Sequence, residues 1–162
     1  MENGLMLAII GAAIAAVIGG IGSSIGILIA SSKGAGVLAE KPNLFGKILI
    51  LTALPGSQGV YGLLIAILIL LKAGVFEKTD QILSMTGGYQ LLGAGIIMAV
   101  AAISSAWLQG KSVAASMGAV ARNEELAGKA IVMSVLIETY AIFGLLVALL
   151  IANSVELVAV AT

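Results

Sequence analysis

The chain has no cysteine and no histidine among its 162 residues. Without cysteine it can form neither a disulfide nor a thiolate metal site, and without histidine it lacks the commonest transition-metal ligand and general base. Charged residues make up 10% of the chain, against about 25% in a soluble domain. The net charge is zero, which argues against a nucleic-acid partner because no basic surface is available for phosphates. A chain with so few charges must face lipid over much of its surface.

Long apolar stretches occupy most of the sequence, from Leu5 to Ser32, Gly46 to Leu71, Tyr89 to Ala121 and Gly128 to Ala152. Each is longer than the roughly 20 residues needed to cross a bilayer core. Only helices or closed barrels satisfy the backbone inside a membrane, and no alternating strand pattern is present. The sequence therefore predicts an all-α membrane protein of four transmembrane helices. The N-terminus has no positive charge before the first stretch, so we expect that helix to be retained rather than cleaved as a signal peptide.

The chain is also an internal repeat. Shifting the first half by 82 positions aligns it with the second half without a gap, and Gly62-Leu63-Leu64 then falls on Gly144-Leu145-Leu146. A repeat of two helices keeps its orientation, so the halves are parallel copies of one helical hairpin. We place the hairpins at residues 1–80 and 81–162.

Basic residues and small residues are both unevenly distributed. The first and third loops with their flanks hold six of the eight basic residues, so the positive-inside rule places these loops in the cytoplasm. Glycine, alanine and serine recur at spacings of three and four in the first and third helices. Such spacings let helix backbones approach closely. We therefore expect helices one and three to form a tight inner layer, with two and four facing lipid or a partner.

One acidic residue, Glu138, lies deep inside a predicted span, whereas the other seven lie near termini or loops. A charged acid at that depth costs at least about 2.5 kcal/mol on insertion scales. No lysine or arginine lies at the same depth to pair with it. The alternative is a protonated structural glutamate, but an intramembrane acid indicates a functional site by default.

Polar residues are predicted at the depth of Glu138. Folding each hairpin about its turn brings Gln109 from the second hairpin, and Ser57 and Gln58 from the first, to about that level. The 82-residue shift places Gly56 on Glu138 itself. One copy of the repeat therefore supplies the charge, and the other supplies neutral oxygen ligands.

The Pro55-Gly56 pair predicts a break in the second helix. A proline inside a helix leaves the carbonyl four residues earlier without its donor, here that of Leu51. Backbone oxygens near such a break can coordinate a cation. Tyr61 lies on the same helical face as this site and can donate a hydrogen bond to Glu138. The alternative for the Pro-Gly pair alone is a packing kink.

The polar residues favour Na+ over H+ as the bound ion. A proton needs only the carboxylate, whereas a hard metal cation needs several oxygens. Ser57, Gln58, Gln109, Glu138 and one carbonyl would supply about five. Two glutamine amides in a buried site are costly unless they are satisfied. A divalent ion is disfavoured because one carboxylate would leave a net positive charge buried.

Three motifs carry a family resemblance: Leu54-Pro55-Gly56-Ser57-Gln58-Gly59-Val60-Tyr61-Gly62, Leu108-Gln109-Gly110-Lys111 and Ile137-Glu138-Thr139-Tyr140-Ala141. Over its whole length the chain resembles the rotor-ring proteolipid, also called the K or c subunit, of sodium-translocating V-type ATPases. The resemblance implies Na+ ligands at the Leu54 carbonyl and the side chains of Ser57, Gln58, Gln109 and Glu138, with Tyr61 as hydrogen-bond partner of the acid. Ser57 stands where sodium-transporting members have threonine, which keeps the hydroxyl and loses a methyl group.

The resemblance also implies the partners and the setting. We expect a non-catalytic subunit that forms a ring of identical copies in lipid, faces a stator residue that is an arginine, and contacts central-stalk subunits through its cytoplasmic loops. The membrane is expected to be a bacterial plasma membrane. Three alternatives stay open: the same rotor carrying H+, a small four-helix multidrug exporter, and a structural pore or scaffold. The 4% aromatic content argues against the exporter, and a scaffold would not need Glu138.

Overall fold

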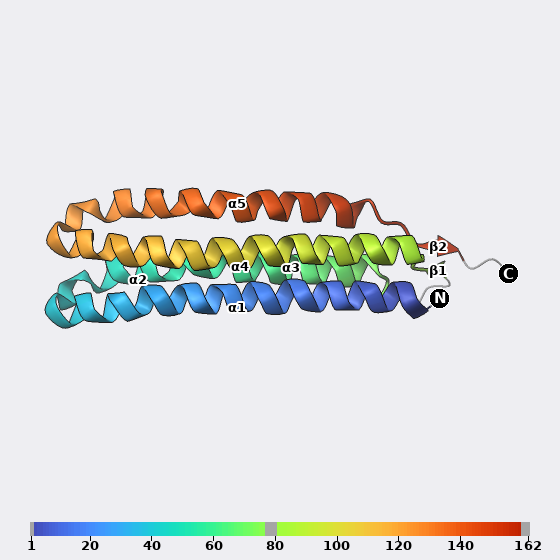
Figure 1. The fold of residues 1–162 in the computed structure, drawn as a ribbon, viewed down its shortest axis with the longest axis horizontal. Helices are drawn as coiled ribbons and strands as arrows, with labels where there is room; N and C mark the ends of the chain where they lie inside the picture. The colour runs from blue at the N-terminus through green and yellow to red at the C-terminus, as the bar shows by residue number, and fades with distance from the viewer. Residues whose placement is uncertain (1, 77–80, 160–162) are drawn as a thin grey trace.

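The computed structural model describes residues 2–76 and 81–159 as a bundle of long helices (Figure 1). The elements in chain order are α1 (Glu2–Glu40), η1 (Pro42–Leu44), α2 (Phe45–Ala53), η2 (Leu54–Gly56), α3 (Ser57–Lys72), β1 (Gln81–Ile82), α4 (Met85–Arg122), η3 (Glu124–Leu126), α5 (Ala127–Asn153) and β2 (Val158–Ala159). Within the described ranges, four stretches are long and apolar enough to cross a membrane: Gly4–Glu40, Pro42–Lys72, Met85–Arg122 and Glu124–Asn153. The prediction of four membrane-spanning helices is thereby confirmed.

The first helix is longer than the sequence predicts. The apolar stretch ends at Ser32, but α1 continues to Glu40 and stops where the Lys41 N–H bonds to the Val37 carbonyl. Within this extension Gly34 packs closely on α2, since a Cβ at that position would lie 2.8 Å from the Ile48 side chain. The missing side chain lets α1 pack directly against α2 beyond the apolar stretch.

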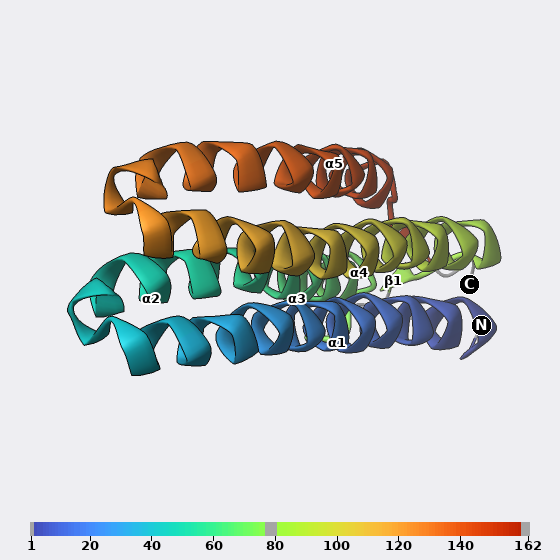
Figure 2. The same cartoon turned by 60° about the vertical axis from the view of Figure 1, so that its left-hand side comes forward.

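Both helical turns lie at one end of the bundle, and the beginning of α1 lies at the other (Figures 1 and 2). At this second end β1 pairs with β2 in a two-residue antiparallel ladder. The pair joins the middle connection to the segment after α5. The predicted hairpin boundary between residues 80 and 81 borders residues 77–80, which lie outside the described ranges, so it stays a prediction. The cytoplasmic placement of the turns also stays a prediction.

Helices α1 and α4 pack closely against each other, as the small residues predict. That they form an inner layer, with the other two spans facing lipid or a partner, stays a prediction. A Cβ added at Gly88 would lie 2.7 Å from the Cα of Gly4, and one added at Gly95 would lie 2.8 Å from the Cα of Gly11. Backbone contact at these positions requires glycine because any side chain would overlap the facing helix. Figure 2 shows α4 between α1 and α5, so α4 packs against the last helix as well as against α1.

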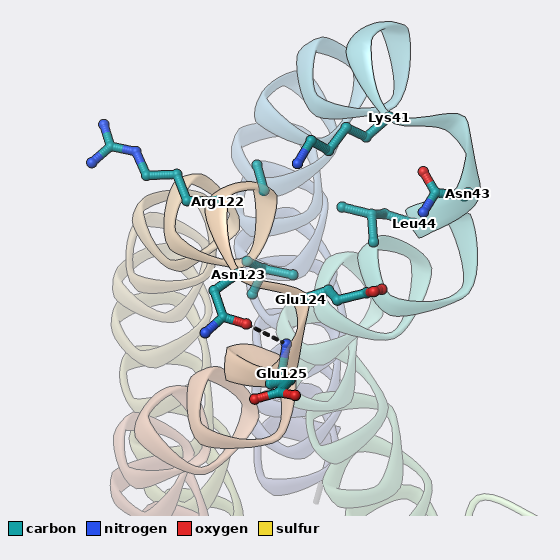
Figure 3. A pocket seen from close by; sticks show the side chains of 9 residues that line it. Lys41, Asn43, Leu44, Arg122, Asn123, Glu124 and Glu125 are labelled. Carbon is teal, nitrogen blue, oxygen red and sulfur yellow. Dashed lines mark hydrogen bonds between the residues drawn. The ribbon is translucent and has the colours of Figure 1, made fainter.

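The end that carries the two turns has a hollow of about 310 Å³ between them (Figure 3). Lys41 lines it from the first turn, and Asn123 and Glu125 line it from the second. The Asn123 side chain accepts a hydrogen bond from the Glu125 N–H at 3.0 Å. An ion pair between Lys47 Nζ and Glu124 Oε2, 2.8 Å apart, links α2 to η3. Both side chains are exposed, so water and salt screen this pair and it contributes little to stability.

Candidate ion-binding site

Glu138 lies midway along α5 and is buried, with 8% of its surface exposed. Its Oε1 accepts hydrogen bonds from the Ser57 hydroxyl at 2.5 Å and the Tyr61 hydroxyl at 2.7 Å. Its Oε2 faces the Gln109 amide nitrogen at 3.4 Å. The acid that the sequence isolates is therefore surrounded by donors from α3 and α4.

The Pro55-Gly56 pair forms the short 3₁₀ turn η2 between α2 and α3. The expectation that the Leu51 carbonyl is left free is wrong, because the Leu54 N–H donates to it. A 3₁₀ turn shortens the hydrogen-bond spacing to three residues, which gives this carbonyl a partner despite the proline. The Leu54 carbonyl accepts from the Ser57 N–H and lies 3.2 Å from the Ser57 hydroxyl oxygen, whose single proton is donated to Glu138. Ser57 thus lies between the Leu54 oxygen and Glu138.

Gln58 and Gln109 are fully buried and bonded to each other. The Gln58 amide nitrogen lies 2.7 Å from the Gln109 side-chain oxygen, and the Gln58 oxygen lies 3.3 Å from the Ser57 hydroxyl. The Gln109 nitrogen also lies 3.2 Å from the Ser134 carbonyl. Because buried amides are costly without partners, this network accounts for how two glutamines are accommodated between helices.

Every side chain that the sequence singles out is therefore brought to one place: Ser57, Gln58, Tyr61, Gln109 and Glu138 form one connected hydrogen-bond network. The Leu54 carbonyl joins it through Ser57. The network offers hydroxyl, amide and carboxylate oxygens at one depth of the bundle. Such oxygens are the ligands that hard cations prefer.

Two serines that the sequence reasoning missed also support the site. Ser105 accepts from the Gln58 amide at 3.2 Å and donates to the Ile137 carbonyl at 3.1 Å. Ser23 accepts from the Gly59 N–H at 2.7 Å. Ser23 and Ser105 are equivalent under the 82-residue shift, and this equivalence is the signal that could have found them.

The first hairpin has apolar residues where the second has its polar pair. Gly56 corresponds to Glu138, and Ile27 corresponds to Gln109. The two are also neighbours in space, because a Cβ at Gly56 would lie 3.5 Å from the Cδ1 of Ile27. The duplicated position therefore has neither an acid nor an amide, which leaves one acidic site for the two hairpins.

The site reaches the outer surface of the bundle. A hollow of about 380 Å³ is lined by Ile50, Ala53, Leu54, Ser57 and Glu138. Four of these five residues come from the α2–η2–α3 span, so the acid is approached between that span and α5. On the inner side, Ser134 is fully buried and its hydroxyl has no partner among the described residues. The acid is thus approached from the hollow between the α2–η2–α3 span and α5.

Comparison with known proteins agrees with the duplicated helical fold. The family described as the C subunit of ATP synthase matches residues 10–69 and again residues 92–151. The two matches are offset by 82 positions, which confirms that the chain is a duplicated hairpin. Together they cover well over half of the chain.

Two curated relatives are similar along nearly the whole chain. The A-type ATP synthase subunit K of Methanocaldococcus jannaschii is 43% identical over 150 residues, and the match covers 93% of this chain and 63% of the relative. The V-type sodium ATPase subunit K of Enterococcus hirae is 36% identical over 149 residues, with 92% of each chain covered. The chain thus spans less than two thirds of the first relative's length and nearly all of the second's. Because both hairpins match the family and both relatives align along the chain, the chain belongs to the family of ATP synthase C subunits.

Proposed function

We propose that the chain is the membrane rotor subunit of a V-type or A-type rotary ATPase and that it carries Na+ on Glu138 as the rotor turns. The observation that supports this most is the buried Glu138 carboxylate, which is contacted by Ser57, Tyr61 and Gln109 from two other spans. The subunit itself is non-catalytic. It binds, shields and releases an ion while ATP is hydrolysed elsewhere in the complex.

The proposed mechanism follows from the position of the acid. An ion that enters from one side of the stator neutralises Glu138, and the neutral site can then face lipid during rotation. A positively charged stator residue, expected to be an arginine, later displaces the ion toward the other side. Moving one elementary charge against 100 mV requires about 2.3 kcal/mol. One ATP can therefore drive several ions.

Na+ is favoured over H+ because the site contains more oxygens than a proton needs. The proposed ligands are the Leu54 carbonyl and the side chains of Ser57, Gln58, Gln109 and Glu138. A proton would need only the carboxylate, and the two buried glutamines would then have no role in the ion's binding. The name of the Enterococcus hirae relative includes sodium, which supports Na+, whereas that of the Methanocaldococcus jannaschii relative names no ion.

The rotor function is tested by Glu138→Gln in the assembled ATPase. We expect this variant to abolish ATP-driven ion uptake into vesicles, because the amide cannot alternate between charged and neutral states. Glu156→Gln is the matched control, since Glu156 is exposed beyond the end of α5. Ion uptake that persists in the Glu138 variant at the control rate would show that the acid does not carry the ion.

The choice between Na+ and H+ is tested by Gln109→Leu, with Gln90→Leu as a control because Gln90 is exposed near the start of α4. Removing one buried neutral ligand is expected to cost about 1–3 kcal/mol, or roughly 10–100-fold in Na+ affinity. The measurement is the Na+ concentration that gives half-maximal ATP hydrolysis. If Gln109→Leu leaves this concentration unchanged, Gln109 is not a Na+ ligand. ATP hydrolysis by the natural chain that does not depend on Na+ at all would favour the proton alternative.

The proposed partners are identical copies in a ring and central-stalk subunits at the two turns. The hollow between the turns is lined by Lys41 and Arg122 and by Glu124 and Glu125, so it offers charges of both signs to a stalk surface. We further propose, from the family resemblance, a bacterial plasma membrane. The positive-inside rule supports placing the turns in the cytoplasm. Labelling of Lys41→Cys from one side of sealed membranes tests this orientation, because the variant adds a cysteine to a chain that has none.

A further inference from the structure

The internal packing of the two hairpins has a fixed register. In α1 and α4, the glycines that face each other in backbone contact are separated by 84 positions: Gly4 with Gly88, Gly11 with Gly95 and Gly26 with Gly110. A Cβ at Gly110 would lie 2.6 Å from the Cα of Gly26, so the contact is as close at this end as at the other. The register therefore holds along most of the α1–α4 interface.

The 82-residue repeat converts this internal register into a prediction for contacts between copies. Adding 82 to the number of a residue in α1 gives the equivalent residue of α4. When copies lie side by side, the α1 on the free side of α4 belongs to the next copy. The internal pair of Gly11 and Gly95 then corresponds to Gly93 of one copy and Ala13 of the next. This mapping uses only the repeat and the contacts within one chain.

Ala13 is exposed and Gly93 is half-buried in the single chain, and both have small or no side chains. A Cβ added at Gly93 would meet no other described atom within 4 Å. Ala13 is exposed on α1. Exposed apolar side chains surround them, with Ile9 46% and Ile10 43% exposed on α1, and Ile96 44% exposed on α4. Like the α1–α4 interface within the chain, these faces consist of small and apolar residues, but they have no partner among the described residues of the chain.

We propose that copies of the chain assemble by packing α4 of one copy against α1 of the next, with Gly93 in contact with Ala13 of the next copy. The inference rests on the proposed ring and adds the register of its inner layer. The same mapping brings Leu108 to Leu28 of the next copy, where the internal interface has Gly110 and Gly26. These leucines are 49% and 64% exposed in the single chain. Copies therefore approach most closely at Gly93 and are held further apart at Leu108.

Cysteine cross-linking tests the register directly, because the natural chain has no cysteine. The double variant carries Ala13→Cys and Gly93→Cys and is oxidised in native membranes. The control carries Ala13→Cys and Val100→Cys. Val100 is exposed on the same helix, roughly 10 Å further along at 1.5 Å per residue. A disulfide requires Cα atoms within about 7 Å, so the control pair is out of reach in the proposed register.

The expected result is a ladder of dimers, trimers and larger species from the Ala13 and Gly93 variant, with none from the control or from either single variant. A disulfide within one chain does not join it to a second chain, so the bands of the ladder report contacts between copies alone. A ladder from the control that equals that of the test pair, or no ladder from the test pair, would overturn the proposed register.

A second variant keeps the proposal testable if the cysteine pair does not fold. Gly93→Leu should remove the high-mass assembly in mild detergent, whereas Gly118→Leu, at another glycine with open space around its Cβ, should keep it. An intact assembly in Gly93→Leu would overturn the contact. ATP-driven ion uptake by the natural chain is measured in parallel, so failure of the register is distinguished from failure of the proposed function.

Discussion

The Glu138 carboxylate depends on two hydroxyl groups that reach the same oxygen from α3. Ser57 lies at the first position of α3 and Tyr61 lies one turn later, so both side chains leave the same face of the helix. Each donates to Oε1, at 2.5 Å and 2.7 Å. Together they hold the carboxylate at one rotamer, which keeps Oε2 toward Gln109.

Replacing Tyr61 by phenylalanine removes one of these donors without changing the ring. We expect Tyr61→Phe to weaken Na+ binding by roughly tenfold, because a hydrogen bond to a charged group is worth about 1.5–3 kcal/mol. The measurement is the Na+ concentration that half-protects Glu138 from a carbodiimide. Tyr140→Phe is the control, since Tyr140 is 71% exposed on α5. Equal half-protection in both variants would contradict a role for the Tyr61 hydroxyl.

At this scale the sequence predicts the site residues well but not their exact bonding. Ser57, Gln58 and Gln109 are predictable because hairpin depth can be counted along four unbroken spans. Ser105 is not, since a serine in a small-residue stripe looks like packing, and its role depends on how α4 is rotated toward Gln58. The partner of the Leu51 carbonyl is not predictable either, because the backbone changes to a 3₁₀ turn that a proline alone does not indicate.

At the scale of elements, the site depends on the 3₁₀ turn that separates α2 from α3. Pro55 is buried, and a Cβ at Gly26 would lie 2.6 Å from the Pro55 Cβ, so the turn packs directly on α1. The turn determines where Ser57 lies at the start of α3. The geometry of one helix break thus sets the position of a proposed ligand.

Replacing Pro55 by alanine should allow α2 and α3 to join as one continuous α-helix. Proline is about 3 kcal/mol less favourable than alanine inside a helix, so we expect Pro55→Ala to keep the helix while moving Ser57. The expected outcome is several-fold weaker Na+ protection of Glu138 with unchanged or higher thermal stability. Pro42→Ala, at the start of η1, is the control. Full Na+ protection in the Pro55 variant would show that the break is a packing feature alone.

The second prediction at this scale concerns the contact between α1 and α4. A Cβ at Gly95 would lie 2.8 Å from the Gly11 Cα, so Gly95→Ala forces the two backbones apart. Overpacking of this kind costs about 1–3 kcal/mol. We expect a lower midpoint of thermal unfolding in detergent, whereas Gly118→Ala, with open space around its Cβ, should leave the midpoint unchanged. A midpoint that Gly95→Ala does not lower would contradict the close backbone contact.

The elements themselves follow from the sequence with little ambiguity. Four apolar stretches, short turns and a stripe of small residues are enough to predict the four membrane spans and the close packing of α1 against α4. The ends of the helices are less predictable. Helix α1 continues past Ser32 to Glu40, where Gly34 contacts α2, and a local sequence pattern does not reveal such contacts. The short β1–β2 ladder is not predictable either, because two residues give no alternating pattern.

For the molecule as a whole, the duplication produces two similar hairpins with different chemistry. The second has Glu138 and Gln109, and the first has Gly56 and Ile27 at the equivalent positions. Ser57, Gln58 and Tyr61 of the first hairpin nevertheless contribute to the site of the second. The proposed ion site, one for four helices, thus uses side chains from both copies of the repeat.

The central claim is that Glu138 binds Na+ within this network, and carbodiimide labelling of Glu138 tests it most directly. The reagent modifies a protonated carboxyl group, so a bound Na+ should block the reaction. We predict that labelling of the natural chain slows steeply as Na+ rises at fixed pH and ionic strength, and that K+ at the same concentrations does not slow it. Labelling at equal rates with and without Na+ would contradict the sodium site.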